Sequence, residues 1–232
     1  MDNQDFDQYA KTKTFNLSVA DTWRAAATDI FSRADRPKAD IKFLDVGCGD
    51  GKYFQYLVGQ GLSVDNIHGV EISRLRVERC HALGWNRAVY VEKGAPLPYD
   101  DDTFDVVNLM EVVEHIPSNH IGGVLDQIRR VLRPHGTLIV STPNYPIKRF
   151  YDLFDAVVHR KWARFRDDPT HVTFYNHDRL GRVLGAHFAR VDARCFKTGF
   201  LYRRLRQSPY TMHKMLFLCT DKRSVAPGPG TS

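Results

Sequence analysis

A glycine-rich turn between an apolar run and a helical pattern constrains this chain more than any other segment does. Residues 43–53 have the sequence FLDVGCGDGKY, which predicts a buried strand, a tight turn and then a helix. Glycine lets the backbone turn sharply and approach a ligand closely, and the helix behind it offers free N–H groups to an anion. A P-loop would need a glycine at position 46, where this chain has Val46. The G-x-G-x-x-G dinucleotide pattern would need a glycine in place of Lys52 or Phe54, so neither motif is present.

Strands and helices alternate on both sides of this turn. Apolar runs predict strands at 41–46, 66–72, 88–92, 104–112, 137–142, 188–196 and 213–219. Helical periodicity predicts helices at 22–32, 51–59, 73–83, 121–132, 147–166 and 177–184. The alternation predicts an α/β fold with a mostly parallel sheet. The last two strands lack an intervening helix, so we expect them to form an antiparallel pair at the sheet edge.

Two carboxylates stand next to the expected turn. Glu71 ends the second predicted strand, and in a Rossmann-like sheet an acid there faces the first turn and accepts both ribose hydroxyls. The alternative is a solvated glutamate at a strand end. Asp45 closes the first strand, where it would orient the turn or meet a cationic ligand group.

Four segments in order resemble the class I S-adenosylmethionine-dependent methyltransferases: LDVGCGDG at 44–51, GVEIS at 69–73, LPYDDDTFDVVNLMEVVEHI at 97–116 and LRPHGTLIVSTPN at 132–144. The resemblance implies a Rossmann-like sheet of seven strands, mostly parallel with an antiparallel last strand, and helices on both faces. It also implies that S-adenosylmethionine lies across the carboxyl ends of the first strands.

The resemblance assigns the parts of this cofactor. The glycine turn would hold the methionine and ribose portions, Glu71 the ribose hydroxyls, and the Leu109–Met110 backbone would lie near the sulfonium or amino group. Relatives often bind the adenine amino group with an acid that this chain lacks, so either Glu92 or backbone contacts alone would serve. The residues expected at the cofactor are Asp45, Gly47, Cys48, Gly49, Glu71, Ile72, Glu92, Leu109 and Met110.

A carboxylate–histidine cluster follows the fourth predicted strand. Glu111, Glu114 and His115 are spaced i, i+3 and i+4, so a helical turn would put them on one face. With His171 they would suit Mg²⁺, Mn²⁺ or Zn²⁺. Without a metal, His115 or His171 would act as general base. The cluster resembles polyprenyl-catechol O-methyltransferases of ubiquinone biosynthesis and small-RNA 3′-end 2′-O-methyltransferases.

The acceptor is expected near the segment after the fifth strand. Aromatic candidates for its pocket are Tyr145, Phe150, Tyr151, Phe154, Trp162, Phe174 and Tyr175. Basic candidates for an anionic group or membrane surface are Arg160, Lys161, Arg164, Arg166 and the 202–206 segment. The net charge of +6 resides in residues 145–166 and 197–223, and the remainder is slightly acidic.

We expect one methyltransferase domain over residues 1–225, followed by a disordered tail at 226–232. Its parts are an N-terminal helical cover (1–36), a cofactor-binding core (41–144), a substrate lid (145–187) and C-terminal strands (188–223). Neither a membrane-spanning run nor a secretory signal is visible, and four scattered cysteines fit the reducing cytoplasm.

The sequence predicts an enzyme that methylates a hydroxyl of a small molecule, such as a quinone precursor, a lipid-linked or glycan intermediate, or a secondary metabolite. That acceptor could be anionic or lipid-linked, with peripheral membrane contact. RNA 3′-terminal 2′-O-methylation and a catalytically silent cofactor-binding scaffold remain as alternatives.

Overall fold

A seven-stranded sheet forms the centre of the computed structural model, which describes residues 3–12, 18–158, 160, 168, 170–196, 208 and 211–223. The strands are β1 (Phe43–Val46), β2 (Ile67–Glu71), β3 (Ala88–Tyr90), β4 (Phe104–Met110), β5 (Leu132–Pro143), β6 (Phe188–Phe196) and β7 (Lys214–Lys222). Their order is β3-β2-β1-β4-β5-β7-β6. The first five run parallel, and β7 is antiparallel to both β5 and β6. The predicted seven-stranded sheet is therefore confirmed.

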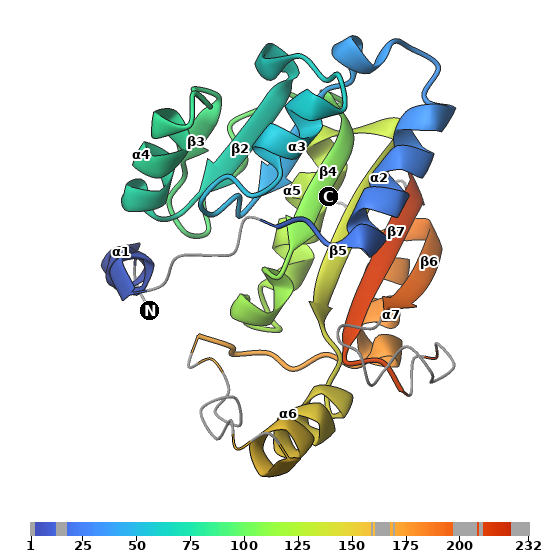
Figure 1. Cartoon of the computed structure of the whole chain (residues 1–232). Coiled ribbons are helices and arrows are strands. Elements are labelled where there is room, and N and C mark those ends of the chain that lie inside the picture. The colour runs from blue at the N-terminus through green and yellow to red at the C-terminus, as the bar shows by residue number, and fades with distance from the viewer. Residues whose placement is uncertain are drawn as a thin grey trace, which may run out of the picture.

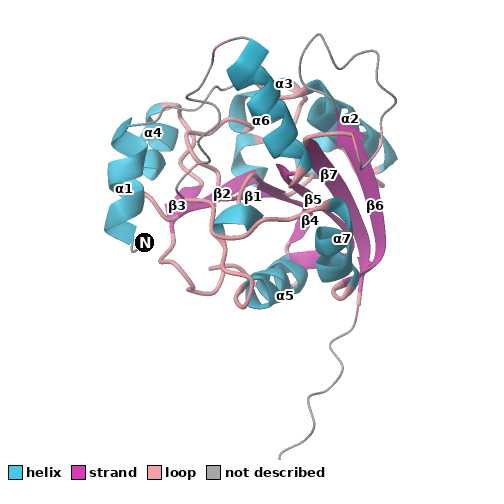
Figure 2. Ribbon diagram, turned by 90° about the horizontal axis from the view of Figure 1, so that it is seen from below, coloured by secondary structure: helices cyan, strands magenta, loops and turns pink. Residues whose placement is uncertain are grey.

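Helices cover both faces of this sheet. The α-helices of the described chain are α1 (Asn3–Thr12), α2 (Asp21–Arg33), α3 (Phe54–Gly59), α4 (Arg74–Ala82), α5 (Ile121–Val131), α6 (Ile147–Val158) and α7 (His177–Gly185). Figure 2 shows α2 and α3 on one side of the sheet and α5 and α7 on the other. Each side has its own apolar core, one built around Trp23 and Phe54 and the other around Leu125 and Leu184. A parallel sheet covered on both faces explains why β1 is buried along its whole length.

Close packing beneath the glycine turn depends on Gly69 in β2. A Cβ atom at this position would lie 2.6 Å from the Trp85 ring and 2.9 Å from the Cys48 sulfur. Trp85 in turn stacks on Phe54 at a centroid distance of 5.1 Å. The absent side chain therefore lets β2 approach the turn that follows β1.

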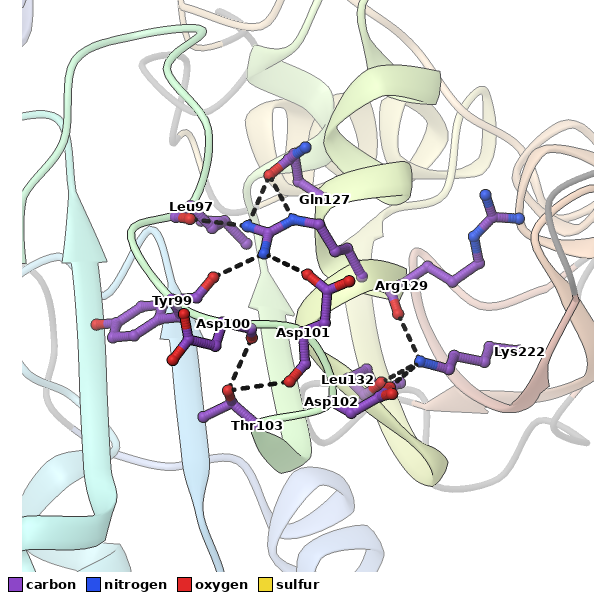
Figure 3. Close-up of polar contacts among 11 residues, drawn as sticks. Leu97, Tyr99, Asp100, Asp101, Asp102, Thr103, Gln127, Arg129, Leu132 and Lys222 are labelled. Atoms are coloured by element: carbon purple, nitrogen blue, oxygen red, sulfur yellow. Dashed lines mark hydrogen bonds and ion pairs between the residues drawn. The ribbon is translucent and has the colours of Figure 1, made fainter. Parts of the chain in front are cut away.

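Arg130 on α5 binds the loop that leads into β4. Figure 3 shows Leu97 and Tyr99 of this loop beside Gln127 of α5. The Arg130 guanidinium donates to the carbonyl oxygens of Leu97 (2.9 Å) and Tyr99 (2.7 Å), and to the side chains of Gln127 and Asp101. In the other direction, the Asp102 N–H of the loop donates to the Arg130 carbonyl at 2.9 Å. The acidic residues 100–102 therefore help to fix the start of β4 against α5.

Some boundaries differ from those predicted. β5 begins at Leu132 rather than Thr137, because Leu132 pairs with Phe104 before a shift in register. α1 is not predicted as a separate helix, since its sequence is largely polar and holds few apolar residues. The expected 147–166 helix is seen as α6, and of residues 159–166 only Arg160 belongs to the described residues. The expected tail at 226–232 lies outside them.

The arrangement leaves one end of the sheet for a site. In Figure 1, β5 points toward α6, and α1 lies beside α4, apart from the sheet. In the part of the chain that the structure describes, no helix has the length and apolar character needed to cross a membrane.

Candidate functional site

A cavity of about 1070 Å³ lies at the carboxyl ends of the parallel strands. Gly47 after β1, Glu71 of β2 and Met110 of β4 all line it. Small-molecule sites in proteins usually occupy roughly 300–1,000 Å³. The cavity therefore has room for a cofactor and a second molecule together.

The glycine turn has the backbone that its sequence predicts. Gly47, Gly49 and Gly51 have φ angles of +75°, +56° and +81°, a left-handed conformation that glycine adopts without strain. The N–H groups of Gly47 and Cys48 both donate to the Val70 carbonyl, at 2.9 and 3.1 Å. A Cβ atom on Gly47 would lie 2.5 Å from Val112, so this position has no space for a side chain.

Glu71 connects the turn to the end of β2. One carboxylate oxygen accepts the Gly49 N–H at 2.8 Å, and the other accepts the N–H groups of Ile72 and Ser73 at 2.8 and 3.0 Å. Burial raises the pKa of Glu71, while Arg76 and these donors favour its charged form. The carboxylate lines the cavity beside the turn, at the place predicted for an acid that receives ribose hydroxyls.

Asp45 lies behind the turn rather than on the cavity wall. The Asn108 amide donates to its Oδ1 atom at 2.8 Å, and its Oδ2 atom is buried without a hydrogen-bond partner among the described residues. Burial raises the pKa of Asp45 to about 7. This position fits a residue that orients the turn from behind, and contact of Asp45 with a cationic ligand group stays a prediction.

Four of the remaining residues predicted at the cofactor, Cys48, Ile72, Glu92 and Met110, line the cavity. The Leu109 side chain is fully buried in the apolar core, and the backbone contact expected of Leu109 stays a prediction. Glu92 is exposed at the cavity rim, and its role toward adenine stays a prediction.

Three of the four predicted metal ligands come together. Glu114, His115 and His171 each offer a ligand atom, and these atoms lie within 4.8 Å of one another. The two imidazole rings meet edge to face with centroids 4.9 Å apart. The chain folds this way because the Val172 and Thr173 N–H groups donate to the Glu114 carbonyl, at 2.9 and 3.0 Å.

Each histidine has one ring nitrogen engaged by a neighbour. His115 Nδ1 lies 3.0 Å from the Thr170 carbonyl oxygen, and His171 Nδ1 lies 3.1 Å from the Tyr145 hydroxyl. Burial lowers the pKa of His115, which favours its neutral form. Burial and then Glu111 raise the pKa of Glu114 to about 8.

Glu111 does not join this group, and the expected helical turn that starts at Glu111 is wrong. Glu111 has a φ of +57°, and only Val113–His115 form a short 3₁₀ turn. Its carboxylate instead accepts the Lys214 ammonium at 2.6 Å and the Ser141 hydroxyl at 2.7 Å. Burial opposes ionisation, but Lys214 holds the pKa of Glu111 below its usual value.

The described aromatic candidates for the acceptor pocket do not line the cavity. The Tyr145 hydroxyl contacts His171 Nδ1, and its ring packs against Phe174. Phe150 and Phe154 are exposed, and Tyr175 is buried in the core. Tyr151 donates to the Thr211 carbonyl at 2.5 Å. Trp162, the basic residues Lys161, Arg164 and Arg166, and the 202–206 segment lie outside the described residues.

The cavity also contains residues that sequence reasoning missed. Phe6 and Tyr9 of α1 form part of its wall, and Lys52 and Lys214 supply positive charge. Lys52 follows the glycine turn directly, which is a signal that the sequence did contain. Lys214 reaches the site only because β7 pairs with Pro143 of β5, and this long-range pairing cannot be inferred from sequence spacing.

Comparison with known proteins gives a consistent result. Residues 20–187 match the model of the methyltransferase domain family. The chain is 35% identical over 157 residues to a demethylmenaquinone methyltransferase of Clavibacter sepedonicus, covering 65% of this chain and 61% of that protein. It is 30% identical over 151 residues to a ubiquinone biosynthesis O-methyltransferase of Colwellia psychrerythraea, covering 62% and 56%. The match thus spans about three fifths of the length of these relatives.

Solved structures share the fold. An S-adenosylmethionine-dependent methyltransferase from Archaeoglobus fulgidus superposes with a TM-score of 0.60 at 17% identity, covering 87% of this chain and 92% of that one. The 1,6-didemethyltoxoflavin-N1-methyltransferase of Burkholderia thailandensis, solved with S-adenosylhomocysteine, gives 0.54 at 18% identity, covering 88% and 82%. At such identities the likeness concerns the fold alone.

Proposed function

This chain belongs to the methyltransferase domain family, and on that premise we propose that it transfers a methyl group from S-adenosylmethionine to a hydroxyl of a small molecule. The observation that carries the proposal is the placement of His115 and His171 on the wall of the same cavity as Glu71 and the glycine turn. A methyl donor and a proton acceptor would then share one cavity. The O-methyltransferases among the relatives support a hydroxyl as the acceptor group.

Methyl transfer needs no covalent bond between the protein and the substrate. Methyl transfer from a sulfonium is an in-line displacement, so proximity and alignment supply much of the rate. The acceptor oxygen must lose its proton, and a neutral imidazole is suited to receive it. Burial lowers the pKa of His115, which favours the neutral ring, and its Nδ1 is engaged by Thr170. Without a metal, we assign the role of general base to His115, with His171 beside it.

A divalent metal fits the same cluster. One carboxylate and two imidazoles, each imidazole with a hydrogen-bond partner on its other nitrogen, form a donor set typical of Mn²⁺ or Zn²⁺ sites, and Mg²⁺ stays a further candidate. Glu114, His115 and His171 would hold the ion, and a bound ion would lower the pKa of the acceptor hydroxyl. Glu111 is excluded from this set by its ion pair with Lys214.

Lys52 is the candidate partner for an acidic group on the acceptor. Lys214 is neutralised by Glu111, whereas the Lys52 ammonium lies over the Tyr53 ring at 5.5 Å. A quinone precursor is the acceptor class that the ubiquinone relatives support. α6 exposes Phe150 and Val157 to solvent, at 68% and 58%, which supports peripheral contact with a membrane holding a lipid-linked acceptor.

Cofactor binding is tested by thermal unfolding with and without S-adenosylhomocysteine. We expect the ligand to raise the melting temperature of the wild-type chain and of Glu78→Ala, an exposed change on α4. Glu71→Ala should lose most of the shift. A shift that survives in Glu71→Ala would contradict the cofactor assignment.

Methyl transfer is tested by incubating the protein with labelled S-adenosylmethionine and panels of catechols and hydroxyquinols. Mass spectrometry should find a product heavier by one methyl group. Transfer to short RNA ends instead, in a manner that weakens steeply with added salt, would favour the RNA alternative. Tight cofactor binding with no transfer to any acceptor would favour the scaffold.

A further inference from the structure

The N-terminal helix α1 connects the two ends of the cavity. On the cofactor side, Asp7 accepts the Ser73 hydroxyl at 2.6 Å and the Leu75 N–H at 3.3 Å. Arg79 of α4 donates to the Ala10 carbonyl at 3.0 Å. These contacts attach α1 to the chain directly after Glu71. Figure 1 shows the resulting position of α1 beside α4.

On the other side, α1 contacts the segment that carries His171. The Tyr9 hydroxyl donates to the Oδ2 atom of Asp168 at 2.5 Å, the length of a strong bond to a carboxylate. The Oδ1 atom of Asp168 accepts the N–H and the hydroxyl of Thr170, at 3.1 and 2.7 Å, and its carbonyl accepts the His171 N–H at 3.0 Å. Asp168 therefore shapes the turn that presents both residues.

The same turn determines which nitrogen of His115 holds the proton. A carbonyl oxygen can only accept, so the contact between Thr170 and His115 Nδ1 requires a hydrogen on Nδ1. In the neutral ring the lone pair is then on Nε2. If the Thr170 carbonyl moved away, nothing in this contact would favour one tautomer over the other.

We propose that Tyr9 is a positioning residue for His115, acting through Asp168 and the Thr170 carbonyl to keep the Nε2 lone pair available. The helix that covers the cofactor side thereby also sets the tautomer of the base on the acceptor side. The catalytic consequence rests on the proposed function, whereas the tautomer itself does not.

The matched variant is Tyr9→Phe, which removes the hydroxyl and keeps a ring in the cavity wall. Nitrogen NMR of ¹⁵N-histidine-labelled protein reports the His115 tautomer without any methyl acceptor. We expect one protonated and one unprotonated ring nitrogen in the wild type and in Lys11→Ala, an exposed change on the same helix. In Tyr9→Phe the two signals should move toward a common average. Unchanged signals in Tyr9→Phe would overturn the proposal.

Kinetics give the second test. Tyr9→Phe should lower kcat about tenfold, a part of the 10²–10⁴-fold that a general base supplies, and change the dissociation constant for S-adenosylhomocysteine less than about twofold. Asp168→Ala should lower kcat as well, and adding Tyr9→Phe to it should cause no further loss. A full additional tenfold loss in the double variant would show that Tyr9 does not act through Asp168. If no methyl transfer is found at all, the proposed function fails while the NMR result still decides this inference.

Discussion

Asn108 donates to Asp45 over 2.8 Å, and Trp23 fixes the direction of that bond. The Trp23 indole N–H can only donate, and it meets the Asn108 Oδ1 atom at 2.9 Å. The amide nitrogen of Asn108 must then face Asp45. The helix α2 thus orients a carboxylate at the end of β1 whose second oxygen has no partner in the described part of the chain.

Asp45→Asn should remove a pH dependence of stability. Burial raises the pKa of Asp45 to about 7, so the folded protein holds this proton more tightly than the unfolded chain does. Each step in pH from about 4 to about 7 therefore favours unfolding. We expect the wild type to lose roughly 2–4 kcal/mol from this group over that window. Urea unfolding at several pH values should show a flatter profile for Asp45→Asn.

The same variant should leave cofactor binding nearly unchanged. Asp45 lies behind the glycine turn and not on the cavity wall, so Asp45→Asn should change the dissociation constant for S-adenosylhomocysteine less than about threefold. Asp100→Asn, an exposed change, is the control for both measurements. Equal pH profiles for Asp45→Asn and the wild type would contradict the assignment.

Lys214→Met should destabilise the fold by about 1–2 kcal/mol, because it leaves the Glu111 carboxylate without its cation. The expected loss of stability is small because the Lys214 and Glu111 side chains keep about a third of their surface exposed. Lys214 holds the pKa of Glu111 low despite burial, so the contribution is present above the unfolded pKa, about 4.3, and is lost as the pH falls below it. Adding Glu111→Gln should recover part of the loss, and a double variant as unstable as the sum of both changes would contradict the pairing.

The cofactor side was predictable because its signals are local. The glycine turn, Glu71 and the two strands that precede them lie within about thirty residues of one another. Each of these motifs can be recognised from the backbone conformation that it needs. The acceptor side was predictable only in part. His115 and His171 were expected to meet, but Glu111 leaves the cluster because its left-handed backbone breaks the helical spacing.

Contacts between distant segments account for the rest. Lys214 enters the cavity through the pairing of β7 with β5, and Tyr9 enters it through the docking of α1 on α4. Neither contact has a sequence spacing from which it could be inferred. Exposed aromatic residues on α6 misled the prediction, because composition cannot tell which face of a helix meets a cavity.

Arg130→Ala should lower the free energy of unfolding by more than the loss of the ion pair with Asp101 would explain. The change removes hydrogen bonds to the carbonyl oxygens of Leu97 and Tyr99, so we expect a loss of about 2–3 kcal/mol in urea unfolding. Asp101 is the charged partner but keeps 74% of its side chain exposed. Asp101→Asn should therefore cost less than about 1 kcal/mol. Similar losses for both variants would show that the ion pair, rather than the carbonyl contacts, stabilises the loop.

Metal binding gives the sharpest test of the acceptor side, because two glutamates three residues apart are expected to differ. Glu114 lies with His115 and His171, whereas Glu111 is paired with Lys214. Titration calorimetry with Mn²⁺ or Zn²⁺ should show binding that Glu114→Gln and His171→Ala weaken at least tenfold, since each removes a ligand atom. Tyr145→Phe removes the partner of His171 Nδ1 and should weaken binding by about ten- to a hundredfold. Glu111→Gln should leave the affinity within about twofold of the wild type. If Glu111→Gln abolished binding and Glu114→Gln did not, the assignment of ligands would be wrong. If the wild-type chain bound neither ion, His115 would be left as a metal-free base.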